Sequence, residues 1–250
     1  MLQDRRRELI LRALRNDGPA TVTGLAAQLA VSPATVRRDL IDLGDQGLLR
    51  RVYGGAVPIV DVDDPFAEVA DVRVEQKEAV ARRCVAEVKD GETLLLDIGT
   101  TVHRVARLLR GRSVTVVTSN MAVYEELVEE PTIQLILLGG VVRRDYRSLV
   151  GFLTEDNLRQ IHANRLVLGT SGVRPDGEVT DTTVVQVSVK RAMIAASDQV
   201  ILVADSGKFP GTGMARVCGA EELDMVITND DADASTLAAL AERGVRVVTA

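Results

Sequence analysis

The first 57 residues place apolar and polar positions in a pattern that predicts three short helices. Apolar side chains recur at helical spacing in DRRRELILRALRNDG, and Gly18-Pro19 ends that helix. TVTGLAAQLA predicts a second helix, with Thr23 at its N-cap. VSPATVRRDLIDLGDQG predicts a third, with Ser32 at the N-cap and Pro33 at the first helical position. The apolar positions of the three helices are Leu9, Ile10, Ala13, Leu14, Leu25, Ala26, Leu29, Val36, Leu40 and Leu43.

The stretch that follows, LLRRVYGGAV, has strand-forming residues and a Gly-Gly turn, so it predicts a small β-hairpin. Two short helices joined by a tight turn, the second with Thr35, Arg37 and Arg38 on its polar side, fit a helix-turn-helix in which the hairpin is a wing. Arginines early in such a helix can donate to guanine edges or to phosphates. Asp39 and Asp42 fall among them, and we expect them to orient the arginines through ion pairs. The same spacing also fits a solvated helix held by its own salt bridges.

The rest of the chain predicts a linker and then a larger domain. Residues 58–72 are acidic, contain proline and lack a clear period, so we expect a linker there. VEQKEAVARRCVAEVKDG predicts an amphipathic helix that ends at Gly91. Beyond it, near-continuous Val/Leu/Ile runs alternate with helical stretches, which is typical of a parallel sheet buried on both faces. The predicted fold class is α/β, with a small N-terminal winged helix-turn-helix domain at 1–57 and a larger parallel-sheet α/β domain at 73–250.

Composition and charge narrow the class of protein. The chain has 250 residues and a formal charge of −6, yet residues 1–57 hold nine arginines against six carboxylates, a net of about +3 that leaves about −9 for the remainder. This asymmetry indicates an N-terminal domain that binds nucleic acid, attached to an acidic larger domain. No long uncharged apolar run occurs, and no apolar segment follows the N-terminal charges, so we expect neither a membrane span nor a secretory signal. Cys84 and Cys218 form no CxxC pair, which favours buried thiols in a reducing, cytoplasmic compartment and no metal site.

Polar residues and glycines gather where the predicted strands of the larger domain end. They are Asp97, Gly99, Thr100 and Thr101; Ser119 and Asn120; Gly139 and Gly140; Thr170, Ser171 and Gly172; and Asp205, Ser206 and Lys208. In an open α/β sheet, ligands bind outside the carboxyl ends of the strands. Hydroxyl and backbone N–H groups at a helix N-terminus, as in DIGTT, suit a small anion such as phosphate. Neither GxGxxG nor GxxxxGK(S/T) occurs, which argues against a dinucleotide or P-loop site, and no cofactor is expected.

The stretch VSPATVRRDLIDLGDQGLLRRVYGGAV resembles the DNA-binding signature of the DeoR family of bacterial transcriptional regulators. That pattern runs VS-x-x-T-(I/V)-RRDL, then Leu, Gly, Leu and Arg, and a terminal Gly-Gly-Ala. Two positions depart from it, since Tyr53 stands where the family usually has His and Gly44 where Glu is common. The resemblance implies that DNA is contacted by Ser32, Thr35, Arg37, Arg38, Arg50, Arg51 and Tyr53.

The larger domain resembles the DeoR-type effector domain in DIGTT, VTSN, LLGG with Arg143, SVKRAMI and VADSGKF. That domain is similar in fold to ribose-5-phosphate isomerase. In the family it binds a phosphorylated sugar or related metabolite, and this binding usually lowers the affinity of the protein for its operator. The resemblance implies an effector pocket formed by Asp97, Gly99, Thr100, Thr101, Ser119, Asn120, Gly139, Gly140, Arg143, Lys190, Asp205 and Lys208. Lys77, on a helix expected near the site, is a weaker candidate.

The predicted function is a sequence-specific DNA-binding regulator, a repressor of carbohydrate metabolism genes that responds to a phosphorylated sugar. Its expected partners are a double-stranded operator, the sugar phosphate and further copies of itself in a dimer or tetramer. An architectural DNA-binding protein whose larger domain only dimerises is one alternative, and the aligned polar loops argue against it.

A sugar-phosphate isomerase is the other alternative. Isomerisation needs a carboxylate base and acid partners for the oxygens. The corresponding loop, GTSGVRPDGE, has Thr and Ser where the acids of that enzyme would stand, and Asp176 and Glu178 belong to a Pro/Gly turn. His103 and His162 lie on predicted helical stretches and form no dyad. We therefore expect a regulator and not an enzyme.

Overall fold

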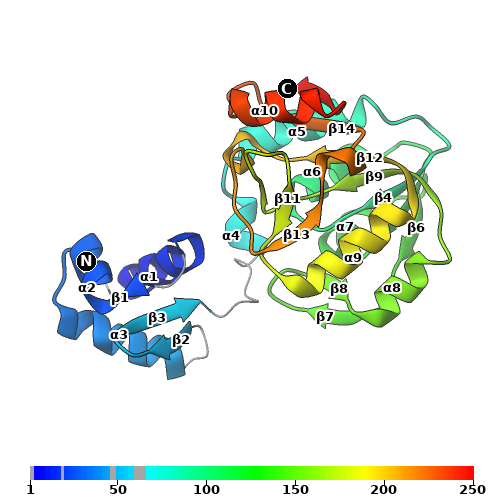
Figure 1. Ribbon diagram of the computed structural model, residues 1–250. Coiled ribbons are helices and arrows are strands. Elements are labelled where there is room, and N and C mark those ends of the chain that lie inside the picture. The colour runs from blue at the N-terminus through cyan, green and yellow to red at the C-terminus, as the bar shows by residue number, and fades with distance from the viewer. Residues whose placement is uncertain (1–2, 18–19, 46–48, 59–65) are drawn as a thin grey trace. The chain divides into compact units, whose positions relative to one another are not determined.

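The computed structural model describes residues 3–17, 20–45, 49–58 and 66–250, drawn as ribbons in Figure 1. The chain divides into two compact units, Met1–Val62 and Asp63–Ala250, which we call the head and the body. The head is a winged helix-turn-helix, and the body is an α/β fold on a parallel sheet. The predicted fold class is confirmed.

In the head, helices pack around one apolar core. They are α1 (Gln3–Asp17), α2 (Val22–Leu29) and α3 (Pro33–Asp45). Their apolar stripes bring together Ile10, Leu14, Leu25, Val36, Leu40 and Leu43, as the periodicity predicts. In the described part of the head, β1 (Ala20–Thr21), β2 (Leu49–Val52) and β3 (Gly55–Pro58) form an antiparallel sheet in the order β1-β3-β2. The hairpin β2–β3 is the predicted wing.

The N-cap of α2 differs from the prediction. The cap is Thr21, whose hydroxyl accepts a hydrogen bond from the Gly24 backbone N–H at 3.0 Å, so the expected cap at Thr23 is wrong. Thr23 lies inside the first turn, and its hydroxyl is 3.2 Å from that of Thr21. Both threonines fit the sequence rule for caps, and the hydrogen bond to the backbone distinguishes them.

The body is built on a sheet of seven parallel strands among the described residues, in the order β15-β14-β12-β9-β4-β5-β6. The strands are β4 (Thr93–Leu96), β5 (Thr115–Thr118), β6 (Gln134–Leu137), β9 (Ala163–Leu168), β12 (Ser197–Val203), β14 (Met225–Thr228) and β15 (Arg246–Thr249). The chain moves outward from β4 to β6 and then starts again at β9, on the other side of β4. This reversal makes a topological switch point between β4 and β9.

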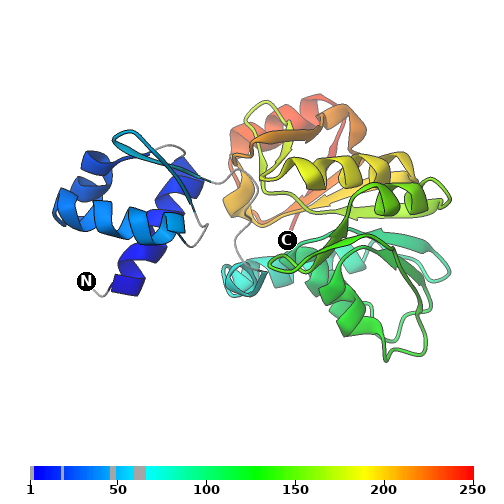
Figure 2. The same ribbon diagram turned by 90° about the horizontal axis from the view of Figure 1, so that it is seen from below.

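Helices cover both faces of this sheet, as its continuous apolar strands require. One layer contains α5 (Val74–Val85), α6 (Thr100–Leu108) and α7 (Met121–Leu127); the other contains α8 (Phe152–Leu158), α9 (Val184–Ala195) and α10 (Ala234–Glu242). In Figure 2 the yellow α9 and the teal-to-green α6 and α7 lie on opposite sides of the sheet.

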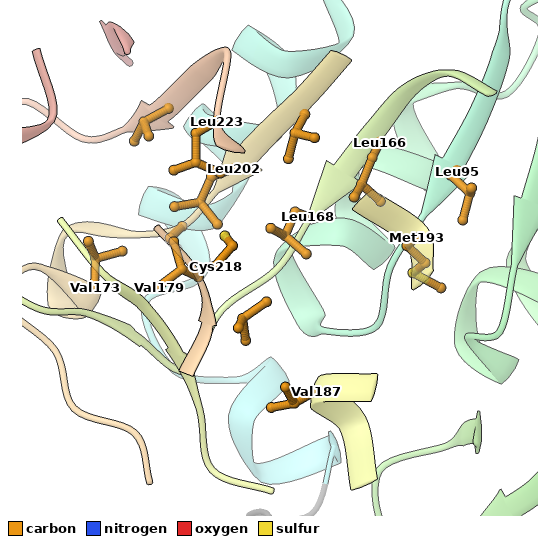
Figure 3. Packing of buried hydrophobic residues seen from close by; sticks show 14 of the residues in the cluster. Leu95, Leu166, Leu168, Val173, Val179, Val187, Met193, Leu202, Cys218 and Leu223 are labelled. Atoms are coloured by element: carbon orange, nitrogen blue, oxygen red, sulfur yellow. The ribbon is translucent and has the colours of Figure 1, made fainter. Parts of the chain in front are cut away.

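Alternate residues of each strand pack into opposite layers. Leu95, Leu166 and Leu202 belong to the cluster under α9, which Figure 3 shows around Leu168 and Met193. Their chain neighbours Leu94, Val167 and Ile201 belong to the cluster under α5 and α6. This alternation is the period of two that a pleated strand imposes, so both faces of the sheet are apolar.

Smaller elements complete the described part of the body. β10 (Gly172–Val173), β11 (Val179–Asp181) and β13 (Ala215–Cys218) form one antiparallel sheet, and β7 (Val141–Arg143) pairs with β8 (Ser148–Val150). Two short 3-10 helices are η1 (Ser206–Lys208) and η2 (Ala220–Glu222).

Cys84 and Cys218 are buried free thiols, and burial raises the pKa of each to about 12. None of the described helices is long and apolar enough to cross a membrane.

Three local features of the body differ from the sequence expectation. A short helix, α4 (Phe66–Ala70), lies inside the segment 58–72 expected to be a linker, and Phe66 is buried. α5 ends at Val85 and not at Gly91, because the chain then forms turns in which the Glu92 carboxylate accepts a hydrogen bond from the Lys89 backbone N–H. His162 lies in the connection before β9 and not on a helix, and its Nε2 is 2.9 Å from Asp198 Oδ1.

Candidate functional site

The surface of α3 opposite its apolar stripe is basic. Arg37 and Arg38 are exposed there. Ser32 caps the helix, because its hydroxyl accepts a hydrogen bond from the Thr35 backbone N–H at 3.1 Å and lies 2.8 Å from the Thr35 hydroxyl. The two hydroxyls therefore hold the first turn together, directly beside the exposed arginines.

Two carboxylates of α3, Asp39 and Asp42, pair with α1, and neither forms an ion pair with Arg37 or Arg38 among the described side chains. Asp39 is buried and accepts hydrogen bonds from Arg6 Nε at 2.5 Å and from Arg6 Nη2 at 3.1 Å. Asp42 accepts a hydrogen bond from Arg7. The ion pairs expected within α3 are thus replaced by contacts that fix α3 against α1.

The wing presents a second polar surface. Arg51 is exposed in β2, and Tyr53 is fully exposed at the hairpin tip. Arg50 also lies in β2, with its side chain outside the described set. A Cβ on Gly44 would lie 3.2 Å from Arg51 Cγ, so the glycine at this position gives the arginine stem room to lie against α3. The departure from the family pattern at position 44 therefore suits the placement of Arg51.

In the body, a cleft opens at the switch point of the sheet. Its open space, which merges with bulk solvent at the mouth, is about 510 Å³. The loops after β4, β9 and β12 line it with residues 98–101, residues 169–171, and Ala204, Asp205 and Lys208. Other elements contribute Val69, Lys77, Tyr146, Asp181 and Lys190.

One wall of the cleft is the N-terminus of α6. Gly99 precedes the helix with a φ of 116°, a conformation that favours glycine. Thr100 and Thr101 form the first turn, and no described side chain caps it. The first N–H groups of a helix lack partners within the helix, so this end offers donors and partial positive charge to a ligand.

The floor of the cleft is a buried ionic cluster. Lys190, from α9, donates hydrogen bonds to Asp97 Oδ2 and to the Gly169 carbonyl oxygen, the second at 2.9 Å, and its Nζ lies 3.5 Å from Asp181 Oδ2. Burial alone lowers the pKa of Lys190, but the Asp97 and Asp181 carboxylates outweigh it and raise that pKa above its ordinary value. Asp97 Oδ1 is buried and has no hydrogen-bond partner within the described residues. Two carboxyl groups around one ammonium leave the floor without spare positive charge.

Lys77 is a second buried lysine at the cleft. It comes from α5 and donates a hydrogen bond to the Val69 carbonyl oxygen of α4 at 2.5 Å. Burial lowers the pKa of Lys77 to about 8, although the Asp205 carboxylate opposes the shift. This amine is therefore a cation that titrates just above neutral pH.

The rim beside Lys77 carries further charged groups. Lys208 is half-buried on η1, which Asp205 caps by accepting a hydrogen bond from the Gly207 backbone N–H at 3.1 Å. Arg73 donates from Nη1 to Ser206 Oγ at 2.9 Å, and its Nε lies 3.7 Å from Asp205 Oδ1. The start of α5 and the loop after β12 are thereby joined at the mouth of the cleft.

The structure brings only part of the expected effector residues together. Those that line the cleft are Gly99, Thr100, Thr101, Lys190, Asp205 and Lys208, and Asp97 lies beneath it in contact with Lys190. Lys77, the weaker candidate, also lines the cleft.

The other expected residues lie outside the lining. Ser119, Asn120, Gly139 and Gly140 follow strands of the same sheet, and Arg143 lies in β7. Ser119 and Asn120 are buried, and Asn120 Oδ1 caps α7 by accepting a hydrogen bond from the Ala122 backbone N–H at 2.9 Å. The Gly139 backbone N–H donates to Asn157 of α8, and a Cβ on Gly140 would lie 2.2 Å from Thr154 Oγ1 of the same helix. Arg143 Nη1 lies 3.5 Å from Thr183 Oγ1 and 3.3 Å from Gln186 Oε1, at the start of α9.

The lining residues that the sequence did not single out include Val69, Tyr146 and Asp181. Val69 belongs to α4, inside the expected linker, and Tyr146 lies in the turn between β7 and β8. Asp181 has a recognisable signal, because the run Asp-Thr-Thr at 181–183 precedes a helix just as DIGTT does.

Both units match family models. Residues 6–61 match the DeoR-like helix-turn-helix domain, and residues 72–230 match the DeoR C terminal sensor domain. The protein is therefore a transcriptional regulator with a DNA-binding head. The chain belongs to the DeoR family, which confirms the resemblance found in the sequence.

Relatives share nearly the whole chain. The glycerol-3-phosphate regulon repressor of Escherichia coli is 32% identical over 249 residues, which cover 99% of this chain and 99% of the relative. The HTH-type transcriptional regulator GlpR of Haloferax volcanii is 32% identical, with 99% and 98% covered, and the L-fucose operon activator of Haemophilus influenzae is 30% identical, with 90% and 91% covered. All three are named as regulators of transcription or of an operon, which fits a protein that is not an enzyme.

Among solved structures, a ribose 5-phosphate isomerase from Methanocaldococcus jannaschii is 15% identical with a TM-score of 0.41, and the match covers 54% of each chain. A likeness this distant carries no functional argument.

Proposed function

We propose that this protein is a repressor of carbohydrate metabolism genes whose operator affinity changes when a phosphorylated sugar binds the cleft of the body. The observation that carries the proposal is the convergence of the α6 N-terminus, Lys77 and Lys208 on one hollow at the switch point. Helix N-termini and lysines are groups that proteins use to bind phosphate. The name of one relative, a glycerol-3-phosphate regulon repressor, supports a phosphorylated ligand.

The distribution of charge favours one orientation of this ligand. The phosphate lies at the α6 N-terminus between Lys77 and Lys208, because the ionic cluster of the floor has no spare positive charge. The carbon chain then points toward the floor. There the Thr170 and Ser171 side chains and the Asp181 carboxylate can hydrogen-bond to sugar hydroxyls.

In the head, the proposed DNA contacts are those implied by the family pattern. Thr35, Arg37 and Arg38 face the major groove, and Ser32, Arg50, Arg51 and Tyr53 lie near the phosphate backbone. The exposure of Arg37 and Arg38 on α3 supports this division. Two heads of a homo-oligomer bind half-sites about 34–36 Å apart on one face of the duplex.

The coupling between the two sites is proposed to pass through α4. This helix is the first described element after the head, and its residue Val69 lines the cleft. The Val69 carbonyl accepts a hydrogen bond from Lys77, and Arg104 Nη2 donates to the Ala70 carbonyl at 3.0 Å. A phosphate that recruits Lys77 competes with the contact that holds α4, so ligand binding changes the element that leads to the head.

We propose further that the cleft senses its ligand without converting it. The isomerase alternative needs a carboxylate base that can exchange a proton with the substrate. Asp181 Oδ1 accepts a hydrogen bond from the Thr183 backbone N–H at 3.1 Å, and its Oδ2 faces Lys190. Asp97 is held beneath the cleft by the same lysine. A bound sugar phosphate is expected to be recovered unchanged after incubation with the protein.

The experiment that tests the proposal is fluorescence anisotropy on DNA from upstream of the protein's own gene, with scrambled DNA at equal salt as control. A panel of phosphorylated sugars and polyols, starting with glycerol 3-phosphate, is added to the complex. We expect specific binding that one compound releases. Specific binding that no compound alters contradicts the effector half of the proposal, and equal affinity for both DNAs contradicts the choice of operator.

Two variants separate the sites. Arg38→Ala is expected to weaken operator binding and to leave ligand affinity unchanged. The loss is about 5- to 150-fold if Arg38, and not Arg37, is the arginine that reads a base. Lys208→Ala is expected to weaken ligand binding and leave operator affinity unchanged. If either variant, shown to be folded by circular dichroism, lost both activities, the proposed division between head and body would be wrong.

A further inference from the structure

Exposed apolar side chains gather on three neighbouring elements of the body. They are Val141 and Val142 on β7, Phe152 and Leu153 at the start of α8, and Val184 and Val185 at the start of α9. Phe152 is 69% exposed and Val141 is 63% exposed, although both residue types are ordinarily buried. We call these six residues the β7–α8–α9 face.

The three elements contact one another, so the six side chains share one surface. At one end of β7, Arg143 reaches Gln186 of α9 at 3.3 Å. At the other end, Val141 Cγ2 lies 3.9 Å from where a Cβ on Gly151 would stand, and Gly151 directly precedes α8. β8 pairs with β7 and packs against both helices, and Figure 1 shows β7, β8, α8 and α9 side by side.

The face is large enough to matter energetically. Six side chains at these exposures present apolar surface on the order of 500 Å², comparable with the largest apolar patch on a typical monomer. A stable interface buries about 800 Å² on each partner, with an apolar centre and a polar rim. The β7–α8–α9 face therefore suffices for the centre of such an interface.

We propose that this face binds the same face of a second copy of the chain, across a two-fold axis. A helix-turn-helix protein that binds two half-sites needs a two-fold partner, and a two-fold interface places one patch against itself. An apolar centre matches itself, whereas a charged centre would meet its own charge. The proposal rests on the DNA-binding function for the need of two heads, and on no assumption about the ligand.

The rim of the face is also self-complementary. The turn between β7 and β8 carries Arg144 and Asp145, both exposed and of opposite charge. If the two-fold axis lies beside this turn, each arginine can meet the partner's aspartate. Charges at the rim of an interface set specificity and orientation, while the apolar centre supplies affinity.

Sedimentation velocity on the full chain, without DNA or ligand, tests the proposal. The test variant is the double substitution Phe152→Asp, Val184→Asp. Both positions lie in the first turn of a helix, where a carboxylate suits the helix dipole and preserves the fold. We expect the wild type to sediment as a dimer or larger assembly at micromolar concentration, and the double variant at half that mass or less.

The matched control is Val128→Lys, an exposed valine just after the C-terminus of α7, where a cation suits the helix dipole. This variant is expected to keep the wild-type mass. A monomeric wild type, or a double variant of unchanged mass, overturns the proposal and leaves the function of the cleft untouched.

A second variant keeps the test decisive if the double variant does not fold. Val142→Cys places a thiol on the face, whereas Cys84 and Cys218 are buried and do not compete for the reagent. A short bismaleimide is expected to join two copies of Val142→Cys and not two copies of the wild type. Failure to cross-link in a protein that sediments as a dimer places its interface elsewhere.

Discussion

At the scale of single residues, Lys77 is a cleft group whose charge changes just above neutral pH. Burial brings the pKa of this lysine down to about 8, so the free cleft loses one cation as the pH rises from 7 to 9. A phosphate monoester is already doubly ionised above about pH 7, because its second pKa is about 6. The pH dependence of ligand binding in this range therefore reports on the protein and not on the ligand.

The resulting prediction is that the affinity for a sugar phosphate falls about tenfold between pH 7 and pH 9. The protonated fraction of Lys77 falls by this factor over the same range, and only the protonated amine attracts the phosphate. Isothermal titration calorimetry measures this directly. Lys77→Met is expected to bind more weakly at pH 7 and to show a flatter profile. Lys89→Met, which removes an exposed lysine at the end of the helical region, serves as the control and should match the wild type. A steep profile that survives in Lys77→Met would assign the titration to another group.

Asp39 holds α3, which carries the proposed DNA contacts, against α1 through Arg6. Asp39→Asn removes the charge that a buried, doubly hydrogen-bonded carboxylate supplies, so we expect lower thermal stability of the head and weaker operator binding. Asp42→Asn is the matched comparison, because Asp42 is half-buried and its ion pair is worth less. Melting curves and anisotropy measure whether Asp39→Asn loses more stability and more operator affinity than Asp42→Asn. An Asp42→Asn variant with the larger loss would contradict it.

At the scale of elements, α4 is anchored by one aromatic side chain. Phe66 meets the rings of His103 and Tyr146 edge to face, with centroids 5.8 and 6.1 Å apart, and the Arg147 guanidinium lies over its ring at 5.6 Å. The Phe66 backbone N–H also donates to the Asp145 carbonyl at 2.9 Å. Because Tyr146 lines the cleft, this anchor gives α4 a second connection to the cleft besides Val69.

Phe66→Ala is therefore expected to uncouple the two sites. In coupled proteins a ligand changes the affinity of a second site by about 5- to 150-fold, and we expect this ratio to fall toward 1 in the variant. Anisotropy on the operator with and without ligand gives the ratio. Tyr124→Ala, a half-buried aromatic of α7, is the control. A variant that binds both partners and keeps the full ratio would exclude α4 as the connecting element.

The elements that could be predicted from the sequence are those whose own pattern determines them. The strands of the body are Val/Leu/Ile runs that both helix layers cover, and the stripes of α1, α2 and α3 fix the core of the head. α4 has only five residues and no period, and the buried contacts of Phe66 with distant residues keep it in place. No local pattern contains that information.

The candidate site was predictable in part for a similar reason. A sequence shows which residues end a strand, so the shared sheet edge of Asp97, Ser119 and Asp205 follows from a parallel sheet. The sequence does not show that the cleft lies at the switch point. At that position the loops after β4, β9 and β12 line the cleft, whereas the loop after β5 is buried and caps α7. The order of strands, set by long-range pairing, decides which polar loops meet.

At the scale of the whole molecule, the salt dependence of the binding constant reports how many heads bind the operator. The logarithm of the binding constant falls with the logarithm of salt concentration by about 0.9 for each phosphate neutralised. Under the proposed interface, Arg51→Ala removes one phosphate contact from each head, so the slope should become shallower by about 2 if two heads bind. A change of about 1 would mean a single head, and no change would remove Arg51 from the DNA interface. Lys89→Met, outside the head, is the control.

The strand order of the body also has a consequence for how the protein is made. β4 pairs on one side with β9, and the chain between them includes β5, β6 and three helices. The ribosome must therefore complete most of the body before its central strand gains its second neighbour. The head is synthesised first and is held by contacts close in sequence, which form quickly, while a parallel sheet waits for distant partners. A nascent chain thus carries a folded DNA-binding head for some time before it carries a finished ligand cleft.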